Sequence, residues 1–143
     1  AFFSYHDALM EKSEGLSKAE REMIVVATSG INQCTYCVVA HGAILRIREK
    51  NPLIADQLAS NYRNAAISPK QGLMLDFAVK VSQQAHEIRD ADIQNLLDAG
   101  FNEEEIWDIG SIAGLFALSK RLATMAGIKS NSEFYNMARS ESG

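Results

Sequence analysis

NQCTYCVVAHG, residues 32–42, is the stretch from which the rest of the chain is interpreted. It contains both cysteines of the protein and one of its three histidines. If a helix starts near Cys34, each residue advances by about 100° around its axis, and Cys34, Cys37 and His41 then share one face. Two thiols with an imidazole one turn further on form a candidate redox site.

The chemistry of this stretch depends on the ionisation of a thiol. A free cysteine has a pKa of about 8.5, and the start of a helix or a CxxC spacing lowers it. Cys34 is predicted at a helix N-terminus and Cys37 in the first turn. His41, four residues after Cys37, can accept the thiol proton or stabilise the thiolate. If one thiol is oxidised to a sulfenic acid, the other can resolve it as a disulfide.

A carboxylate on the preceding helix can complete the set. Glu22 lies 12 residues before Cys34 and at the edge of an apolar helix face. A carboxyl group placed there is partly removed from water, which suits a proton relay. Spacing alone supports this weakly, and Glu11 and Glu20 are the solvent-facing alternatives.

Length and charge limit the classes of protein that the chain can represent. Its 143 residues, 47% of them hydrophobic, suit a single domain over residues 1–143. The net charge is −4 and no basic stripe is present, so nucleic acid is not an expected partner. No apolar run reaches the roughly 18 residues of a membrane helix. Two cysteines three apart and no visible export signal predict a reducing cytoplasm.

The hydrophobic pattern predicts helices throughout, and no strand. Capping boxes are expected at Ser17 with Glu20 and at Asn102 with Glu105. Pro52 and Pro69, the only prolines, each fit the first turn of a helix. The predicted helices cover residues 2–11, 18–31, 34–50, 53–62, 90–99, 103–126 and 132–139. One further helix is predicted to be capped at Ser68-Pro69, with its amphipathic pattern over residues 72–85.

The helix predicted over residues 103–126 is apolar almost all round. Such a helix is either central or an oligomer contact. Trp107 and Phe116 are therefore predicted to lie in the core or between subunits. His6 and His86 have no partner pattern and are predicted to be solvated or structural.

The full pattern, Glu-x11-Cys-x2-Cys-x3-His, resembles the signature of the alkylhydroperoxidase D-like group in the carboxymuconolactone decarboxylase superfamily. The flanking stretches LSKAERE (residues 16–22) and VVAHGA (residues 38–43) agree with it. EIWDI (residues 105–109) looks like the peroxidase-related branch of this superfamily. The resemblance covers roughly residues 2 to 138.

This resemblance implies an all-α fold with the CxxC motif at the N-terminus of a core helix, assembled as a homo-oligomer. It implies a thiol peroxidase that reduces alkyl hydroperoxides without haem or flavin, and that an external dithiol regenerates. Cys37 matches the peroxide-attacking thiol, Cys34 the resolving thiol, and Glu22 with His41 the proton relay. Some members have a histidine where Tyr36 stands here, which implies a slower relay or one suited to another oxidant.

Several alternatives stay open from the sequence. The two cysteines can be small buried hydrophobes, and His41 a core histidine. Cys34, Cys37 and His41, with Glu22, can also form a zinc site, although three ligands on one helix face make a closed tetrahedron awkward. The functional alternatives are a lactone decarboxylase, as in the other branch of the superfamily, and a non-enzymatic thiol–disulfide sensor.

Overall fold

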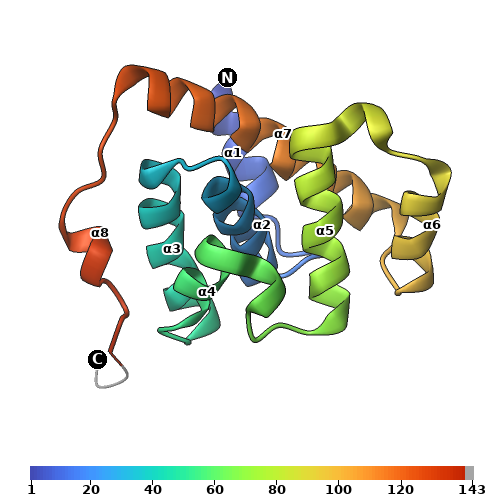
Figure 1. The fold of residues 1–143 in the computed structure, drawn as a ribbon, viewed down its shortest axis with the longest axis horizontal. Coiled ribbons are helices and arrows are strands. Elements are labelled where there is room, and N and C mark those ends of the chain that lie inside the picture. The colour runs from blue at the N-terminus through green and yellow to red at the C-terminus, as the bar shows by residue number, and fades with distance from the viewer. Residues whose placement is uncertain (141–143) are drawn as a thin grey trace.

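A computed structural model describes residues 1–140, and these residues form helices joined by turns, with no strand (Figure 1). The all-α prediction is therefore confirmed. The α-helices are α1 (Phe2–Met10), α2 (Lys18–Ile31), α3 (Thr35–Glu49), α4 (Ile54–Asn61), α5 (Pro69–Gln84), α6 (Asp90–Asp98), α7 (Glu103–Ala126) and α8 (Glu133–Asn136), and two 3₁₀ turns are η1 (Tyr62–Asn64) and η2 (Ala85–Glu87).

The predicted start signals operate as expected. The Ser17 side chain accepts a hydrogen bond from the Glu20 backbone, and the Glu20 carboxylate accepts one from the Ser17 backbone, each at 3.0 Å. Asn102 and Glu105 form the same reciprocal pair at the start of α7. Each box satisfies two backbone N–H groups that would otherwise have no partner within the helix. These caps fix where α2 and α7 begin.

Two boundary predictions need correction. Pro69 is the first residue of α5, as predicted, but Pro52 lies in a turn before α4. The Asn51 side chain accepts a hydrogen bond from the Leu53 backbone at 2.9 Å. In this turn the Leu53 backbone N–H bonds to a side chain and not to a helical carbonyl, so α4 begins only at Ile54. The helix predicted over residues 132–139 is also shorter, and α8 holds four residues.

Helix α2 is the centre of the fold and contacts α3, α4, α5 and α7. In Figure 1 it lies between the α3–α4 pair and the α5–α7 pair. Its middle residues, Ile24 to Ala27, are fully buried. At its end, a Cβ on Gly30 would lie 2.2 Å from the Ala59 carbonyl oxygen. Only glycine allows α2 and α4 to approach this closely, and the approach sets the turn that leads into α3.

The predicted placement of the CxxC motif at a helix start is confirmed. Cys34 is the N-cap residue of α3, in an extended conformation, and its backbone N–H donates to the Ser29 carbonyl at 3.0 Å. Gln33, just before it, adopts a left-handed conformation with φ 56°. This tight turn places α3 directly beside α2.

Helix α7 is more exposed than its composition suggests. Phe116 lies in the core, as predicted, but Trp107 is 75% exposed and does not belong to the core of this chain. Its alternative prediction, a contact between subunits, stays a prediction. Among residues 1–140, no helix combines the length and the apolar character that a membrane span requires.

Candidate active site

The two thiols lie together at the start of α3. Cys34 and Cys37 are 2% and 1% exposed, and both are free. Their sulfur atoms are 2.9 Å apart. A disulfide bond is about 2.05 Å long, so a displacement of about 1 Å would join the two sulfurs. The predicted sharing of one helix face is therefore seen for both cysteines.

A carboxylate–imidazole pair lies one turn further along α3. Glu22 Oε2 on α2 and His41 Nδ1 on α3 are 2.7 Å apart. The Glu22 side chain is 8% exposed and the His41 side chain 12%, so Glu22 is not a surface carboxylate. A hydrogen bond between an imidazole and a carboxylate fixes the orientation of the ring. The fold therefore assembles the second pair that the sequence predicted.

Aromatic rings hold the imidazole of His41 in place. The Phe116 ring packs edge-on against His41, with 4.9 Å between ring centroids. The ring centroid of His6, on α1, lies 5.6 Å from that of Phe116 and 6.3 Å from that of His41. This packing role agrees with the prediction that His6 is structural or solvated.

The two pairs do not touch directly. Among the residues that the structure describes, neither sulfur has a hydrogen bond to His41 or Glu22, although all three groups on α3 follow one face. Nor do any three His, Cys, Asp or Glu side chains within residues 1–140 converge as a metal site would require. The geometry therefore does not support the zinc alternative built on Cys34, Cys37, His41 and Glu22.

Three polar residues beside the dithiol were not predicted from the sequence. Lys120 on α7 is 2% exposed, and its ammonium donates a hydrogen bond to the Thr28 hydroxyl on α2. The neighbouring Ser29 hydroxyl is fully buried and has no hydrogen-bond partner within residues 1–140. Lys120 follows the buried Phe116 by four residues and precedes the buried Ala123 by three. That spacing places a lysine on the core face, and it was the signal in the sequence.

Burial controls the acidity of Cys37. Burial raises the pKa of the Cys37 thiol to about 12, with the nearby Cys34 sulfur as the next cause. The Lys120 charge and the Ser29 hydroxyl act in the opposite direction. The general expectation that a helix start and a CxxC spacing lower a thiol pKa does not describe Cys37 in this reduced state.

The same burial acts on the lysine. It lowers the pKa of Lys120 to about 8, and the two cysteine sulfurs partly offset the decrease. Burial therefore favours the uncharged form of both the thiol and the amine, compared with the same groups in water.

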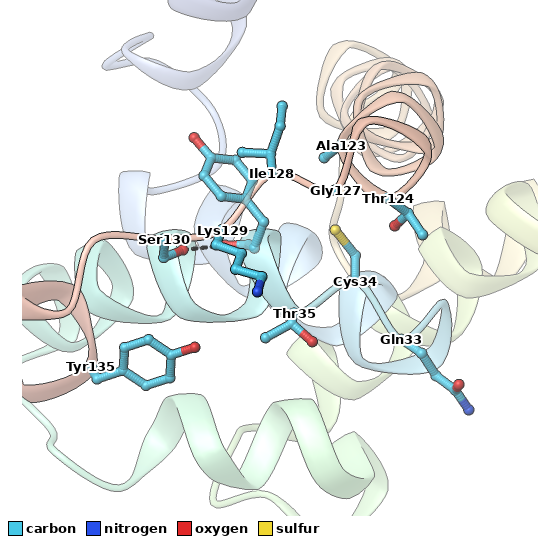
Figure 2. Close-up of a pocket in the computed structure, with 11 residues that line it drawn as sticks. Gln33, Cys34, Thr35, Ala123, Thr124, Gly127, Ile128, Lys129, Ser130 and Tyr135 are labelled. Atoms are coloured by element: carbon cyan, nitrogen blue, oxygen red, sulfur yellow. Dashed lines mark hydrogen bonds between the residues drawn. The ribbon is translucent and has the colours of Figure 1, made fainter.

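A cavity of about 520 Å³ gives access to Cys34. It lies between the start of α3 and the end of α7, and Figure 2 shows the Cys34 sulfur turned toward the Ala123–Gly127 end of α7. Cys37 does not line this cavity. A second cavity, of about 430 Å³, is lined by Lys120 together with Asn32, Arg121, Thr124 and Met125.

Comparison with known protein families identifies the same part of the chain. The profile of the Carboxymuconolactone decarboxylase family matches residues 1–58, which include Glu22, Cys34, Cys37 and His41. No curated protein matches the chain.

Two solved structures are similar over nearly the whole chain. One is described as an alkylhydroperoxidase AhpD core, an uncharacterised peroxidase-related protein from Ralstonia eutropha JMP134. It is 58% identical, with a TM-score of 0.95, over 97% of this chain and 73% of that one. The other, an uncharacterised peroxidase-related protein from Silicibacter sp. TM1040, is 40% identical, with a TM-score of 0.94, over 96% and 72%. The fold and the helix-borne dithiol define an alkylhydroperoxidase D-like protein. This chain belongs to the peroxidase-related branch of the carboxymuconolactone decarboxylase superfamily.

Proposed function

We propose that the protein is a thiol-dependent peroxidase that reduces alkyl hydroperoxides. The observation that carries the proposal is the pair of free sulfurs 2.9 Å apart at the start of α3. The buried Glu22–His41 pair on the same side of that helix supplies proton-transfer groups. The naming of similar structures as peroxidase-related supports the reaction class.

The first step activates and oxidises Cys37. The Glu22–His41 pair takes the Cys37 proton, through a water molecule because no direct hydrogen bond joins the imidazole to the sulfur. The thiolate attacks the terminal oxygen of the hydroperoxide. The S–O bond forms and the O–O bond breaks. The alkoxide leaves and takes the proton back from the relay, which yields an alcohol and a sulfenic acid.

The second step closes the disulfide and makes regeneration possible. The Cys34 sulfur attacks the sulfenic sulfur of Cys37, the S–S bond forms, and hydroxide leaves as water with the Cys34 proton. An external dithiol then supplies two electrons by thiol–disulfide exchange. The cavity beside Cys34 supports attack of that dithiol on Cys34, which releases the Cys37 thiol.

We expect a second copy of the chain to cover the exposed apolar part of α7. Four apolar side chains are 49–79% exposed there, namely Trp107, Leu118, Leu122 and Met125. An exposed apolar surface of this kind favours protein association. Light scattering on the purified protein tests the homo-oligomer, and a monomer at micromolar concentration would contradict it.

A thiol count after one equivalent of an organic hydroperoxide tests the peroxidase function. We expect rapid loss of both thiols in the wild-type protein and no such loss in the Cys37→Ser variant. Adding a dithiol should restore the thiols and allow repeated turnover. Stoichiometric oxidation without turnover would indicate the sensor alternative. Unreactive thiols together with conversion of a carboxymuconolactone would indicate the decarboxylase alternative.

A further inference from the structure

Lys120 is a buried cation without an acidic partner. Its only hydrogen bond within residues 1–140 goes to the neutral hydroxyl of Thr28, and no ion pair of the described chain includes it. By contrast, Lys12, Lys18 and Lys80 each lie within 3.2 Å of a carboxylate oxygen. Lysine is almost never fully buried unless it is paired, because an isolated ammonium loses its hydration. The position of Lys120 therefore calls for an anion that forms during function.

The dithiol can supply that anion. The titratable groups that act on Lys120 are the Cys37 and Cys34 sulfurs from α3 and the Arg121 guanidinium from its own helix. Helix α2 contributes neutral hydroxyls, of which that of Thr28 accepts the hydrogen bond from Lys120. Ala123, one turn after Lys120, packs in the same cluster as both cysteines. Of these groups, only a thiol can become negatively charged.

Ser29 adds a hydrogen-bond donor to the same place. Its buried hydroxyl has no partner in the described reduced structure, yet it favours the ionised form of Cys37. An unsatisfied buried hydroxyl costs free energy in this state, and a hydrogen bond made in another state of the protein explains why it is there. A thiolate at Cys37 would accept from Ser29.

We propose that Lys120 is the counter-ion of the thiolate that forms in the Cys34–Cys37 pair, and that Ser29 donates a hydrogen bond to that thiolate. Lys120 acts on the sulfur through its charge, and Thr28 holds the ammonium in position. This step precedes any oxidant. The proposal builds on the thiol chemistry of the proposed function, but it predicts thiolate formation whether or not a hydroperoxide is the substrate.

The assigned role leads to a measurable change in thiol ionisation. Removing the cation leaves a buried thiolate without compensation, so the thiol pKa must rise. Removing a buried unpaired charge also relieves a desolvation cost, so the fold should not lose stability. Reduced reactivity with unchanged or increased stability distinguishes this role from a structural one.

The test is the rate of iodoacetamide alkylation of the reduced full-length protein near pH 7, where Lys120, with its pKa lowered to about 8, is still largely charged. Lys120→Met should slow alkylation about tenfold, because it lowers the fraction of thiolate. Lys120→Arg should restore most of the wild-type rate. Arg121→Met, which removes an exposed charge one residue away, should leave the rate within a factor of about two.

Ser29→Ala provides an independent variant that removes one oxygen atom. It should also slow alkylation near pH 7, about threefold, because the thiolate loses a hydrogen-bond donor. An unchanged alkylation rate in both Lys120→Met and Ser29→Ala, with circular dichroism and melting temperature intact, would overturn the proposal. Equal decreases in Lys120→Met and Arg121→Met would overturn it as well. Peroxide turnover, measured separately, decides the proposed function and does not enter this result.

Discussion

Two regions on one side of α3 differ in how well their polar groups are satisfied. The Glu22–His41 pair is closed, with a short bond between its partners and Phe116 packed on the ring. Within residues 1–140, the dithiol region holds two free thiols, a serine hydroxyl without a hydrogen-bond partner and a lysine without a carboxylate. A fully hydrogen-bonded pair fixes the geometry of its side chains. Buried polar groups without partners instead favour a state in which one of them changes its charge. The difference indicates that charge develops at the sulfurs.

The largest effect should come from Cys37 itself. Cys37→Ser replaces the attacking sulfur with a hydroxyl that does not ionise near neutral pH, so peroxide-dependent thiol loss should disappear. Cys34→Ser should still react once, because its Cys37 sulfur survives as a sulfenic acid without a resolving partner. Mass spectrometry of the protein after one equivalent of hydroperoxide measures both. Reaction of Cys37→Ser at the wild-type rate would show that Cys34 is the attacking thiol.

Breaking the closed pair should give the next largest effect. Glu22→Gln or His41→Gln removes proton transfer and should lower the rate of peroxide reduction about 10²-fold. The rate of iodoacetamide alkylation near pH 7 should change less than in Lys120→Met, because no hydrogen bond within residues 1–140 joins either residue to a sulfur. Stopped-flow oxidation kinetics measure the rate.

His86→Gln is the matched control for this pair. It removes an exposed histidine, 79% accessible at its side chain, that lies outside the site. Its oxidation rate should equal that of the wild-type protein. If the oxidation rate decreased equally in His41→Gln and His86→Gln, the Glu22–His41 pair would have no specific role in the reaction.

Gly30→Ala tests whether the close approach of α2 to α4 positions the dithiol region. The added Cβ would lie 2.2 Å from the Ala59 carbonyl oxygen, so α2 and α4 must separate. We expect a loss of about 1–3 kcal/mol in the free energy of unfolding, measured by urea denaturation. Peroxide reactivity should also fall, because Cys34 follows this turn. Unchanged stability would show that the α2–α4 contact is easily adjusted.

The pH dependence of stability should give the smallest but most specific effect. The folded pKa of Cys37 is raised to about 12, so the unfolded chain loses this proton first and stability falls as pH rises from about 9 to 12. The folded pKa of Lys120 is lowered to about 8, so this group makes stability rise between about 8 and 10.5. Each group contributes at most about 1.4 kcal/mol per pH unit.

These two contributions nearly cancel between about pH 9 and 10.5, where their ranges overlap. Lys120→Met removes only the rising contribution, so its free energy of unfolding should fall more steeply there than that of the wild-type protein. Urea denaturation at a series of pH values measures the slope. Parallel curves for the two proteins would show that Lys120 keeps an ordinary pKa in the folded state.

The helical boundaries were largely predictable because they depend on local chemistry. The caps at Ser17 and Asn102 and the left-handed stop at Gly127 each act within a few residues. Pro52 was placed wrongly because its neighbour Asn51 forms a side-chain turn, a competing local structure that the proline rule does not weigh. Trp107 was ambiguous because an apolar residue is equally suited to a core and to an interface.

The sequence by itself determined that both thiols lie at the start of one helix, since a three-residue spacing fixes a shared face wherever the helix packs. It also indicated Glu22 and His41 as candidates, through a pattern typical of the family. Only the tertiary structure decided that these two residues meet, and that Lys120, 92 positions from Thr28, lies buried beside the dithiol. The reason is physical: helical periodicity is local, whereas the pairing of helix faces depends on how the whole core packs.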